Sequence, residues 1–418
     1  MPVRLYLLAL NPTDSVTEGF LPAAARLGLS VTLLTDQPAA HRRAHERHPR
    51  GPAAGAGPLP PVDLAGCDVR DFREVIGRIS ALGEPGAVFT NSDHLQTQAA
   101  LAADYFGLPG KDWRAALRTK NKAQLRRSLA RAGLDAVRSA ELLPGEDPAA
   151  LTAGRPPRLR ATDFPCVVKP REGVASEDVV LVGDAAELAA RVREIRARRP
   201  GEALVVEEYL EGPLHTLETL GDGDTLHVLA SFETELCPPP HFVEERMRLL
   251  PAPPAPHTRQ VLAMLRALGV GFGACHTEYA AQGERARIIE VNYRAVGDQC
   301  DLALAEALGV PLFAHILRTH LGEPLPADLG ARRDGRVRME YVCAERGGIL
   351  KTAPGASDTE HDGVHLVYRP LRELGEEHPR HRTNRDYLGV VRATGTDQDR
   401  IDRAVADFLA CRRWEIVS

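Results

Sequence analysis

The sequence RIIEVNYRAVGDQ, residues 287–299, begins as a β-strand, because its isoleucines and valine are the β-branched residues that strands favour. Alternate side chains of a strand point to opposite faces, so Glu290, Asn292 and Arg294 share one face. The other face is apolar and carries Ile289, Val291 and Tyr293. A carboxylate, an amide and a guanidinium on one face of such a strand indicate a site that binds charged groups.

The preceding segment GACHTEYAA is a second predicted strand, and the turn AAQGERA between the two predicts a β-hairpin. If the hairpin is symmetric about Glu284, Glu278 lies opposite Glu290. In the same register His276 lies opposite Asn292. Two carboxylates directly opposite each other repel unless a cation lies between them, so this pair predicts a bound cation.

Carboxylate and amide oxygens suit Mg²⁺, which usually takes its remaining ligands from water and from substrate phosphates. We therefore predict that Glu278, Glu290 and Asn292 bind Mg²⁺. Arg294 would then stabilise negative charge on a transferring phosphoryl or acyl phosphate group. The alternative is that these side chains are ordinary solvated residues of an edge strand.

A magnesium site of this kind implies a nucleotide, and lysines for its phosphates are expected upstream. Lys169, in FPCVVKPREGVASEDVV, ends a predicted strand before a turn that contains Gly173 and Ser176. Backbone N–H groups and the Ser176 hydroxyl in such a turn can close over phosphates, although the turn is not a Walker sequence. Lys122 lies in an amphipathic helix, TKNKAQLRRSLARAGL, and by itself is predicted to be a surface lysine.

The segment LVVEEYLEGP, residues 204–213, is an apolar run that continues into acidic residues and ends at a Gly-Pro break. An adenine ring needs a flat apolar slot and exposed backbone groups at a strand end, and this segment supplies both. The candidate residues for an adenine site are Glu207, Glu208, Tyr209 and Leu210.

The composition excludes several other functions. The chain has 418 residues, enough for two or three domains, and 44% hydrophobic and 26% charged residues are typical of a folded globular protein. A net charge of -5 gives no basic field for nucleic acid or an anionic membrane, so a small-molecule partner is expected. Seven scattered cysteines without a CxxC pair, and no 18-residue apolar stretch, predict a soluble cytoplasmic protein.

The segment PAAHRRAHERHPRGPAAGAGPLPP, residues 38–61, is predicted to be a loop because it is rich in Pro, Gly, Ala and Arg. His41, His45 and His48 lie at i, i+4 and i+7, a spacing that would suit a metal site on a helix. The flanking arginines, prolines and glycines favour a solvated segment instead.

Five motifs follow one another along the chain: NK before an amphipathic helix, VVKP with a short turn, VVEEYLEGP, TEY, and IIEVNYRAVG. Together they resemble the ATP-grasp superfamily, ligases that activate a carboxylate as an acyl phosphate, most clearly over residues 86–325. The resemblance implies an α/β (α+β) fold with an N-terminal Rossmann-like pre-ATP-grasp domain (1–115), an ATP-grasp domain (116–328) whose lid spans about 160–232, and a C-terminal α+β subdomain (329–418).

The resemblance also implies roles for single residues. In the matching motifs Lys122 and Lys169 contact the phosphates of ATP. Glu207 and the backbones of Tyr209 and Leu210 would hold the adenine, with a specificity contact at Glu208. The matching carboxylate strands imply two Mg²⁺ ions, or Mn²⁺ as an alternative, on Glu278, Glu290 and Asn292, with Arg294 near the transferred group.

Two motifs depart from the usual pattern. The sequence PLHTLE looks like the PRHVE arrangement of biotin carboxylase, so His215 would face the nucleotide. The phosphate turn lacks the usual second and third glycines. The resemblance therefore predicts where this turn lies but not the conformation in which it closes.

Within the superfamily, IIEVNYRAVGDQ followed by a helix looks most like the carboxylate–amine ligases of peptide, antibiotic and siderophore assembly. The expected reaction makes an acyl phosphate and ADP, and an amine then displaces phosphate to form an amide, with N–H groups near Gly297 stabilising the oxyanion. The alternatives are a biotin-carboxylase-like enzyme that makes carboxyphosphate and a non-catalytic nucleotide-binding protein. The expected partners are small-molecule carboxylates and amines, with a homodimer left open.

Overall fold

The computed structural model describes residues 2–47, 61–153, 158–160 and 163–417. Its N-terminal domain is a parallel sheet of order β3-β2-β1-β4, made of β1 (Arg4–Leu8), β2 (Ser30–Thr35), β3 (Val62–Gly66) and β4 (Ala87–Phe89). Its helices are η1 (Ser15–Phe20), α1 (Leu21–Arg26), α2 (Pro38–Arg47), α3 (Phe72–Leu82), η2 (Asp93–Leu95) and α4 (Gln96–Tyr105). The parallel α/β character expected of this part of the chain is confirmed.

The segment predicted as a loop, 38–61, instead begins with helix α2. A proline at its first position and the alanines and arginines that follow favour a helix, and they outweigh the loop signal of the later prolines and glycines. His41 is 5% exposed, and its Nε2 lies 2.8 Å from the carbonyl oxygen of Leu10. It is therefore a packed residue, while His48 lies outside the described residues.

A small antiparallel sheet of order β5-β8-β6-β7 forms a separate layer. Its strands are β5 (Ser139–Leu142), β6 (Cys166–Pro170), β7 (Val180–Val182) and β8 (Leu204–Glu208), with helices α7 (Ala149–Ala153) and α8 (Ala185–Arg198) beside them. Helices α5 (Trp113–Lys120) and α6 (Lys122–Arg131) connect this layer to the N-terminal domain. The lid was expected to span about 160–232. The small sheet instead includes β5, which lies before residue 160, and its last strand, β8, ends at Glu208.

A ten-stranded sheet forms the centre of the molecule, with the path β14-β13-β9-β11-β12-β15-β20-β18-β17 and β10 paired to β9. Its strands are β9 (Leu214–Asp222), β10 (Leu226–Ala230), β11 (Phe232–Leu236), β12 (Glu244–Leu249), β13 (Phe272–Gln282), β14 (Arg285–Asn292), β15 (Arg336–Cys343), β17 (Ser357–His361), β18 (Val364–Pro370) and β20 (Tyr387–Gly395). The C-terminal region thus extends the central sheet through β15 to β20.

The remaining elements cover this sheet or flank it. They are α9 (Ala255–Leu268), α10 (Cys300–Leu308), α11 (Leu312–His320), α12 (Gln398–Ala410), the turn η4 (Asn384–Asp386) and a three-stranded sheet of β16 (Gly348–Thr352), β19 (Glu377–His378) and β21 (Glu415–Val417). Among the described residues no single helix is long and apolar enough to cross a membrane; by length and composition alone, the pair α10 and α11, bent by 103°, passes that test together.

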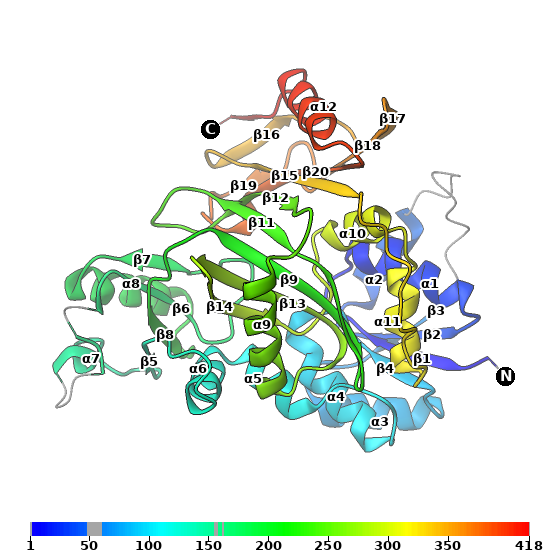
Figure 1. The fold of residues 1–418 in the computed structure, drawn as a ribbon, viewed down its shortest axis with the longest axis horizontal. Coiled ribbons are helices and arrows are strands. Elements are labelled where there is room, and N and C mark those ends of the chain that lie inside the picture. Colours follow the sequence, from blue (N-terminus) through cyan, green and yellow to red (C-terminus); the bar gives the residue numbers. More distant parts are fainter. Residues whose placement is uncertain (1, 48–60, 154–157, 161–162, 418) are drawn as a thin grey trace.

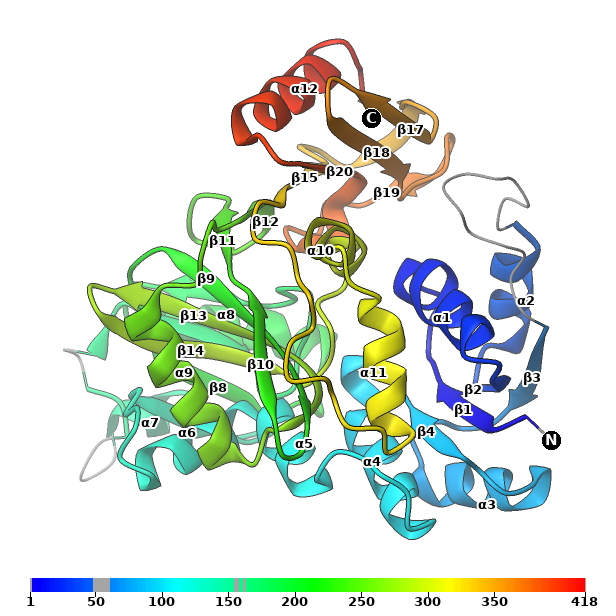
Figure 2. The ribbon, with the colours of Figure 1, turned by 45° about the vertical axis from the view of Figure 1, so that its right-hand side comes forward.

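Two hydrophobic cores hold the layers in place. One core joins the N-terminal domain to α10, α11 and the central sheet, through residues such as Phe20, Phe313 and Met247. The other lies between the β13–β14 hairpin and helices α5, α6 and α9. Figures 1 and 2 show the N-terminal sheet and the small sheet on opposite sides of the central sheet, with the C-terminal strands above them. The second core packs on the apolar face of the hairpin, so the polar face of the hairpin points away from that core.

Candidate active site

The β13–β14 hairpin has the pairing expected at its polar positions: Glu278 lies opposite Glu290, and His276 lies opposite Asn292. The turn is one residue shorter than a symmetric turn about Glu284 would be, since Gln282 pairs with Arg285. A β-bulge at Ile289, between Ile288 and Glu290, restores the register.

Because of the bulge, one part of the prediction about which side chains of β14 face the core was wrong. Ile288, not Ile289, packs into the core beneath the hairpin. Ile289 lies beside Glu290 in the lining of the cavity on the polar side. The bulge inserts one residue at this point, so the alternation on which the prediction rested is shifted there.

A cavity of about 680 Å³ lies on this face and collects residues from all three layers. Twelve of the thirteen predicted site residues line it: Lys122, Lys169, Ser176, Glu207, Glu208, Tyr209, Leu210, Glu278, Glu290, Asn292, Arg294 and Gly297. The N-terminal domain adds two segments, 8–16 and 91–94, and the C-terminal region adds Tyr341, Val390 and the 384–385 turn.

His215 is the exception, and its predicted position was wrong. It pairs with Tyr279 across β9 and β13, whereas the adjacent pair, Thr216 with Glu278, points to the cavity side. The ring of His215 packs edge-to-face against those of Tyr279 and His257, with centroids 5.7 and 6.2 Å away. Strand alternation therefore directs His215 away from the cavity.

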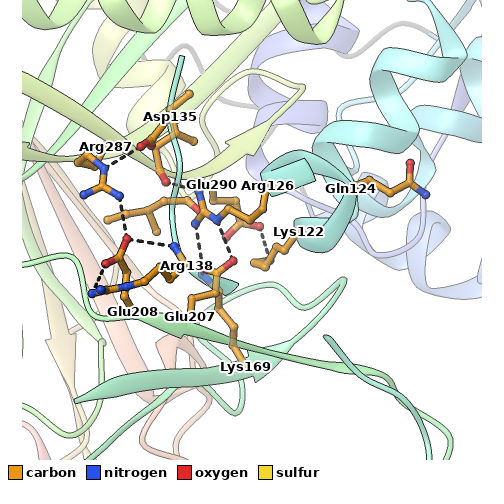
Figure 3. Close-up of polar contacts among 12 residues, drawn as sticks. Lys122, Gln124, Arg126, Asp135, Arg138, Lys169, Glu207, Glu208, Arg287 and Glu290 are labelled. Carbon is orange, nitrogen blue, oxygen red and sulfur yellow. Dashed lines mark hydrogen bonds and ion pairs between the residues drawn. The ribbon is translucent and has the colours of Figure 1, made fainter. Parts of the chain in front are cut away.

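Glu207 is the centre of a buried ion cluster (Figure 3). Its carboxylate binds Arg126 through two hydrogen bonds of 2.8 and 2.9 Å, and the Nζ of Lys169 lies 2.8 Å from its Oε2. Burial opposes the charge of Glu207, but the two cations outweigh burial and hold the pKa of this carboxyl far below its usual value. Glu207, 2% exposed, therefore holds Lys169 at the cavity wall.

Arg126 was not anticipated from the sequence. It is 4% exposed and bridges the layers, because its guanidinium also donates to the carbonyl oxygens of Ile288 and Ile289 on β14. Its spacing of four residues from Lys122 places both side chains on one face of α6, and that spacing was the available signal.

Glu208 points to the other side of β8 and joins a second ion cluster, also visible in Figure 3. It pairs with Arg138 at 2.8 Å and with Arg287 at 2.9 Å. Arg287 in turn binds Asp135 at 2.8 Å. Both carboxylates are thus engaged in ion pairs, and beyond β8 the N–H of Tyr209 donates to the carbonyl oxygen of Pro165 at 3.3 Å.

Lys122 and the hairpin form the opposite wall. The Nζ of Lys122 lies 2.8 Å from Oε1 of Glu290, and the amide of Asn292 donates to Glu278 at 3.2 Å. Burial would lower the pKa of Lys122, but Glu290 reverses this and raises it. The predicted surface location of Lys122 from its helix alone was therefore wrong, because the side chain is buried and lines the cavity.

His276 lies between two carboxylates. Its Nδ1 is 2.7 Å from Glu218 and its Nε2 is 3.4 Å from Glu278. Burial alone would lower its pKa, but the carboxylate of Glu218, followed by that of Glu278, raises the pKa to about 10. A protonated His276 therefore offsets part of the negative charge on the hairpin.

Glu244, at the start of β12, adds a carboxyl group that was not predicted from the sequence. Burial and the neighbouring charge of Glu278 raise its pKa to about 8. Near neutral pH the Glu244 carboxyl is therefore largely protonated, and a cation bound between β12 and the hairpin would favour its ionised form.

Glu278, Glu290 and Asn292 offer the oxygen ligands that Mg²⁺ prefers. Within the described residues, no three His, Cys, Asp or Glu side chains form a group that could hold a metal ion by themselves. The arrangement fits an ion that completes its shell with water and phosphate oxygens.

The phosphate turn takes an unusual backbone for its sequence. Ala175, Ser176 and Asp178 have φ values of 55°, 54° and 56°, in the left-handed region that glycine adopts freely. Each such residue costs on the order of 1 kcal/mol, so contacts elsewhere must hold the turn.

Those contacts come from Arg199 after α8, which forms ion pairs with Glu177 and Asp178, and from the C-terminal region. The N–H of Asn384 donates to the carbonyl of Ala175 at 3.2 Å, and Arg385 forms an ion pair with Glu177. Asp386 fixes this 380–386 segment by accepting from the N–H of His381 at 2.7 Å. The N–H of Glu244 donates to Asn384 at 3.3 Å, so the segment links the phosphate turn to β12.

Comparison with known proteins gives a family match: residues 162–302 match the ATP-grasp domain. A protein of Sinorhizobium fredii (strain NBRC 101917 / NGR234), described as uncharacterized protein y4rH, is 26% identical over 439 residues, which cover 99% of this chain and 84% of that protein. An L-amino acid ligase from Bacillus licheniformis matches with a TM-score of 0.77 and 20% identity, over 100% of this chain and 99% of that chain.

The biotin carboxylase domain of a Hydrogenobacter thermophilus 2-oxoglutarate carboxylase, crystallised with MgADP and bicarbonate, matches with a TM-score of 0.71 and 15% identity, over 100% of this chain and 92% of that chain. At these identities the structural matches concern the fold. They confirm the expected fold class, with a parallel N-terminal domain followed by antiparallel sheets.

Proposed function

Because the chain carries an ATP-grasp domain, we propose that it is an ATP-dependent ligase that joins a carboxylate to an amine. In this reaction the carboxylate attacks the γ-phosphate of ATP, giving an acyl phosphate and ADP, and the amine then displaces phosphate to form the amide. The observation that carries the proposal is one cavity that brings together Lys122, Lys169, Arg294 and the opposed carboxylates Glu278 and Glu290.

The nucleotide would lie between the small sheet and the hairpin. Its phosphates would draw Lys122 and Lys169 from Glu290 and Glu207, the carboxylates that now neutralise them. The adenine would bond to the backbone of Tyr209 and Leu210, since the carboxylates of β8 are engaged, with Tyr209 contributing its carbonyl oxygen because its N–H donates to Pro165. In the absence of nucleotide, these ion pairs keep both lysine ammonium groups at the cavity, so the cations are already in place when ATP binds.

Glu278, Glu290 and Asn292 would hold Mg²⁺, with two ions or Mn²⁺ as further parts of the proposal. When bound, the metal neutralises charge on the phosphates. Arg294 would stabilise the charge that develops on the transferred group. Among the described residues the N–H of Gly297 has no hydrogen-bond partner, so it is free to donate to an oxyanion. The phosphate turn would exclude water from the acyl phosphate.

Amino acids are the first substrates to test, because the similar structure from Bacillus licheniformis is named an L-amino acid ligase. The cavity also has apolar lining beyond the hairpin, from residues such as Met247, Tyr341 and Val390. This lining would accept an apolar part of a substrate.

The test is an ADP-release assay over pools of amino acids, hydroxycarboxylates and amines, with mass spectrometry of the products. Amide formation that requires both substrates supports the proposal. Turnover that depends on bicarbonate would support a carboxyphosphate-forming enzyme instead, and nucleotide binding without turnover would support a non-catalytic protein. The Arg294→Ala variant, purified in parallel, controls for contaminating ATPases.

Location and assembly remain predictions. A homodimer would be tested by light scattering.

A further inference from the structure

Lys111, in the connection between α4 and α5, is a lysine in an unusual place. It is 7% exposed and does not line the cavity. Its ammonium donates to the side-chain oxygen of Gln96 at 2.7 Å and to the carbonyl oxygen of Tyr293 at 2.5 Å. It also lies 4.5 Å from the centre of the Tyr293 ring. No carboxylate lies within ion-pair distance of it in the described residues.

Such a group lowers stability rather than raising it. A buried ammonium without a carboxylate partner costs several kcal/mol relative to water. Burial accordingly lowers the pKa of Lys111 to about 7. The neighbouring His320 gives no compensation, because burial and the charge of Lys111 lower its pKa to about 3. An apolar side chain of similar length would avoid this cost, so the presence of a lysine calls for another explanation.

Both acceptors of Lys111 belong to segments that carry cavity residues. Gln96 donates to the carbonyl oxygens of Thr90 and Ser92 at 3.1 and 2.9 Å, which fixes the 90–93 segment of the N-terminal domain. That segment lines the cavity with Asn91, Ser92 and Asp93. Tyr293 is followed directly by Arg294.

A second hydrogen bond joins the same two segments that Lys111 connects. The N–H of Ala295 donates to the side chain of Asn91 at 3.1 Å. The residues on both sides of Arg294 are therefore tied to the 90–93 segment, by Lys111 on one side and by Asn91 on the other. The other end of Tyr293 is fixed too, because its hydroxyl accepts from the N–H of Phe272 at 3.1 Å.

We infer that Lys111 is a positioning residue, whose ammonium holds the backbone at Tyr293 against the N-terminal domain and so places the guanidinium of Arg294 at the reacting group. The inference rests on the proposed function for the part played by Arg294. The bridge itself is a property of the fold.

The main test is the Lys111→Met variant, which keeps the side-chain length and removes the charge. We expect kcat to fall on the order of 10- to 100-fold, as for a reacting group displaced by about 1 Å, while KM for ATP stays within about twofold. Lys351→Met is the matched control, because Lys351 is exposed on β16, and it should leave both constants unchanged.

A double variant separates positioning from general damage. If Lys111 acts through Arg294, Lys111→Met combined with Arg294→Ala should be no slower than Arg294→Ala alone. If the losses in kcat of the two single variants multiply in the double variant, the inference is wrong. Gln96→Leu, which removes one acceptor of the bridge without a charge change, should reproduce the kcat effect if Lys111→Met does not fold.

Hydrogen exchange tests the bridge without any turnover. In Lys111→Met, but not in Lys351→Met, the amides of residues 293–297 should exchange faster. Unchanged exchange there would overturn the inference even in an active enzyme. If the unaltered protein makes no amide from any substrate pair, the proposed function fails, and the exchange result alone then decides whether Lys111 holds this segment.

Discussion

Arg294 follows the polar strand of the hairpin and lines the cavity near carboxylates of three different elements. Its charge is needed mainly when negative charge develops on the transferred group. We expect Arg294→Ala to bind ATP almost as the unaltered protein does and to lose on the order of 10²-fold in kcat. Calorimetric titration of ATP and the ADP-release assay measure the two effects.

The control for this variant is Arg333→Ala, at an exposed position outside the cavity, which should change neither measurement. An unchanged rate in Arg294→Ala would remove this residue from the mechanism. A large loss of ATP affinity would assign it to nucleotide binding instead.

Glu290 has two neighbours of opposite charge, since it faces Glu278 across the hairpin and pairs with Lys122. In Glu290→Gln the metal loses an anionic ligand, so we expect the Mg²⁺ concentration for half-maximal rate to rise on the order of tenfold. Glu284→Gln, at the exposed turn of the same hairpin, is the matched control. An unaltered Mg²⁺ titration would refute the metal role of Glu290.

At the scale of elements, the hairpin shows what alternation predicts and where it stops. Pairing of Glu278 with Glu290 follows from the period of two in both strands, which the turn composition supports. The bulge could not be predicted, because a shorter turn with one inserted residue gives the same pairing as a longer turn without one. Its effect is confined to Ile289 and the residues before it, where Ile288 takes the core position, and the ligand positions are unaffected.

The phosphate turn shows the opposite case. Its place after β6 was predictable, but its closure depends in part on Asn384 and Arg385, which lie about 200 residues further along the chain. Nothing in either segment indicates the other, since each reads as an ordinary polar loop. Long-range contacts between loops are set by the packing of whole layers, which no local pattern encodes.

This contact leads to a prediction for the turn. Arg385→Gln removes one of the two ion pairs of Glu177, the other being with Arg199, and should loosen the closed turn, which admits water to the acyl phosphate. We therefore expect ADP release to exceed amide formation by about twofold or more, where the unaltered protein keeps them equal. Arg382→Gln, an exposed arginine of the same segment, serves as control. Equal yields of ADP and amide in Arg385→Gln would mean that the ion pair plays no part in excluding water.

At the scale of the molecule, the central sheet explains why one cavity can collect residues from the whole chain. The C-terminal strands extend the same sheet as the hairpin, and α10 and α11 pack between that sheet and the N-terminal domain. The order of the motifs predicted the fold, since each motif marks one layer. The continuity of the sheet was not predictable, because β15 and β20 pair with each other across a long excursion in sequence.

His365 on β18 offers a test of this assembly, because it connects the C-terminal strands to α10. Its Nδ1 lies 2.7 Å from Glu306, and its Nε2 lies 2.8 Å from Asp358. The hydrogen bond to Glu306, aided by Asp358 and opposed by burial, raises the pKa of His365 to about 9. An unfolded histidine titrates near 6.5, so the protonated form is favoured in the folded protein.

A raised pKa means that the stabilisation by His365 is fully present below about pH 6.5 and disappears as the pH rises through about 9. We expect His365→Gln to lower Tm by several degrees at pH 6, where the charge-assisted bonds are lost, and by much less at pH 9.5. His361→Gln, on the adjoining strand at an exposed position, should show no such pH dependence. Equal Tm differences at both pH values would mean that His365 contributes packing rather than charge, and that α10 holds the C-terminal strands through its apolar contacts.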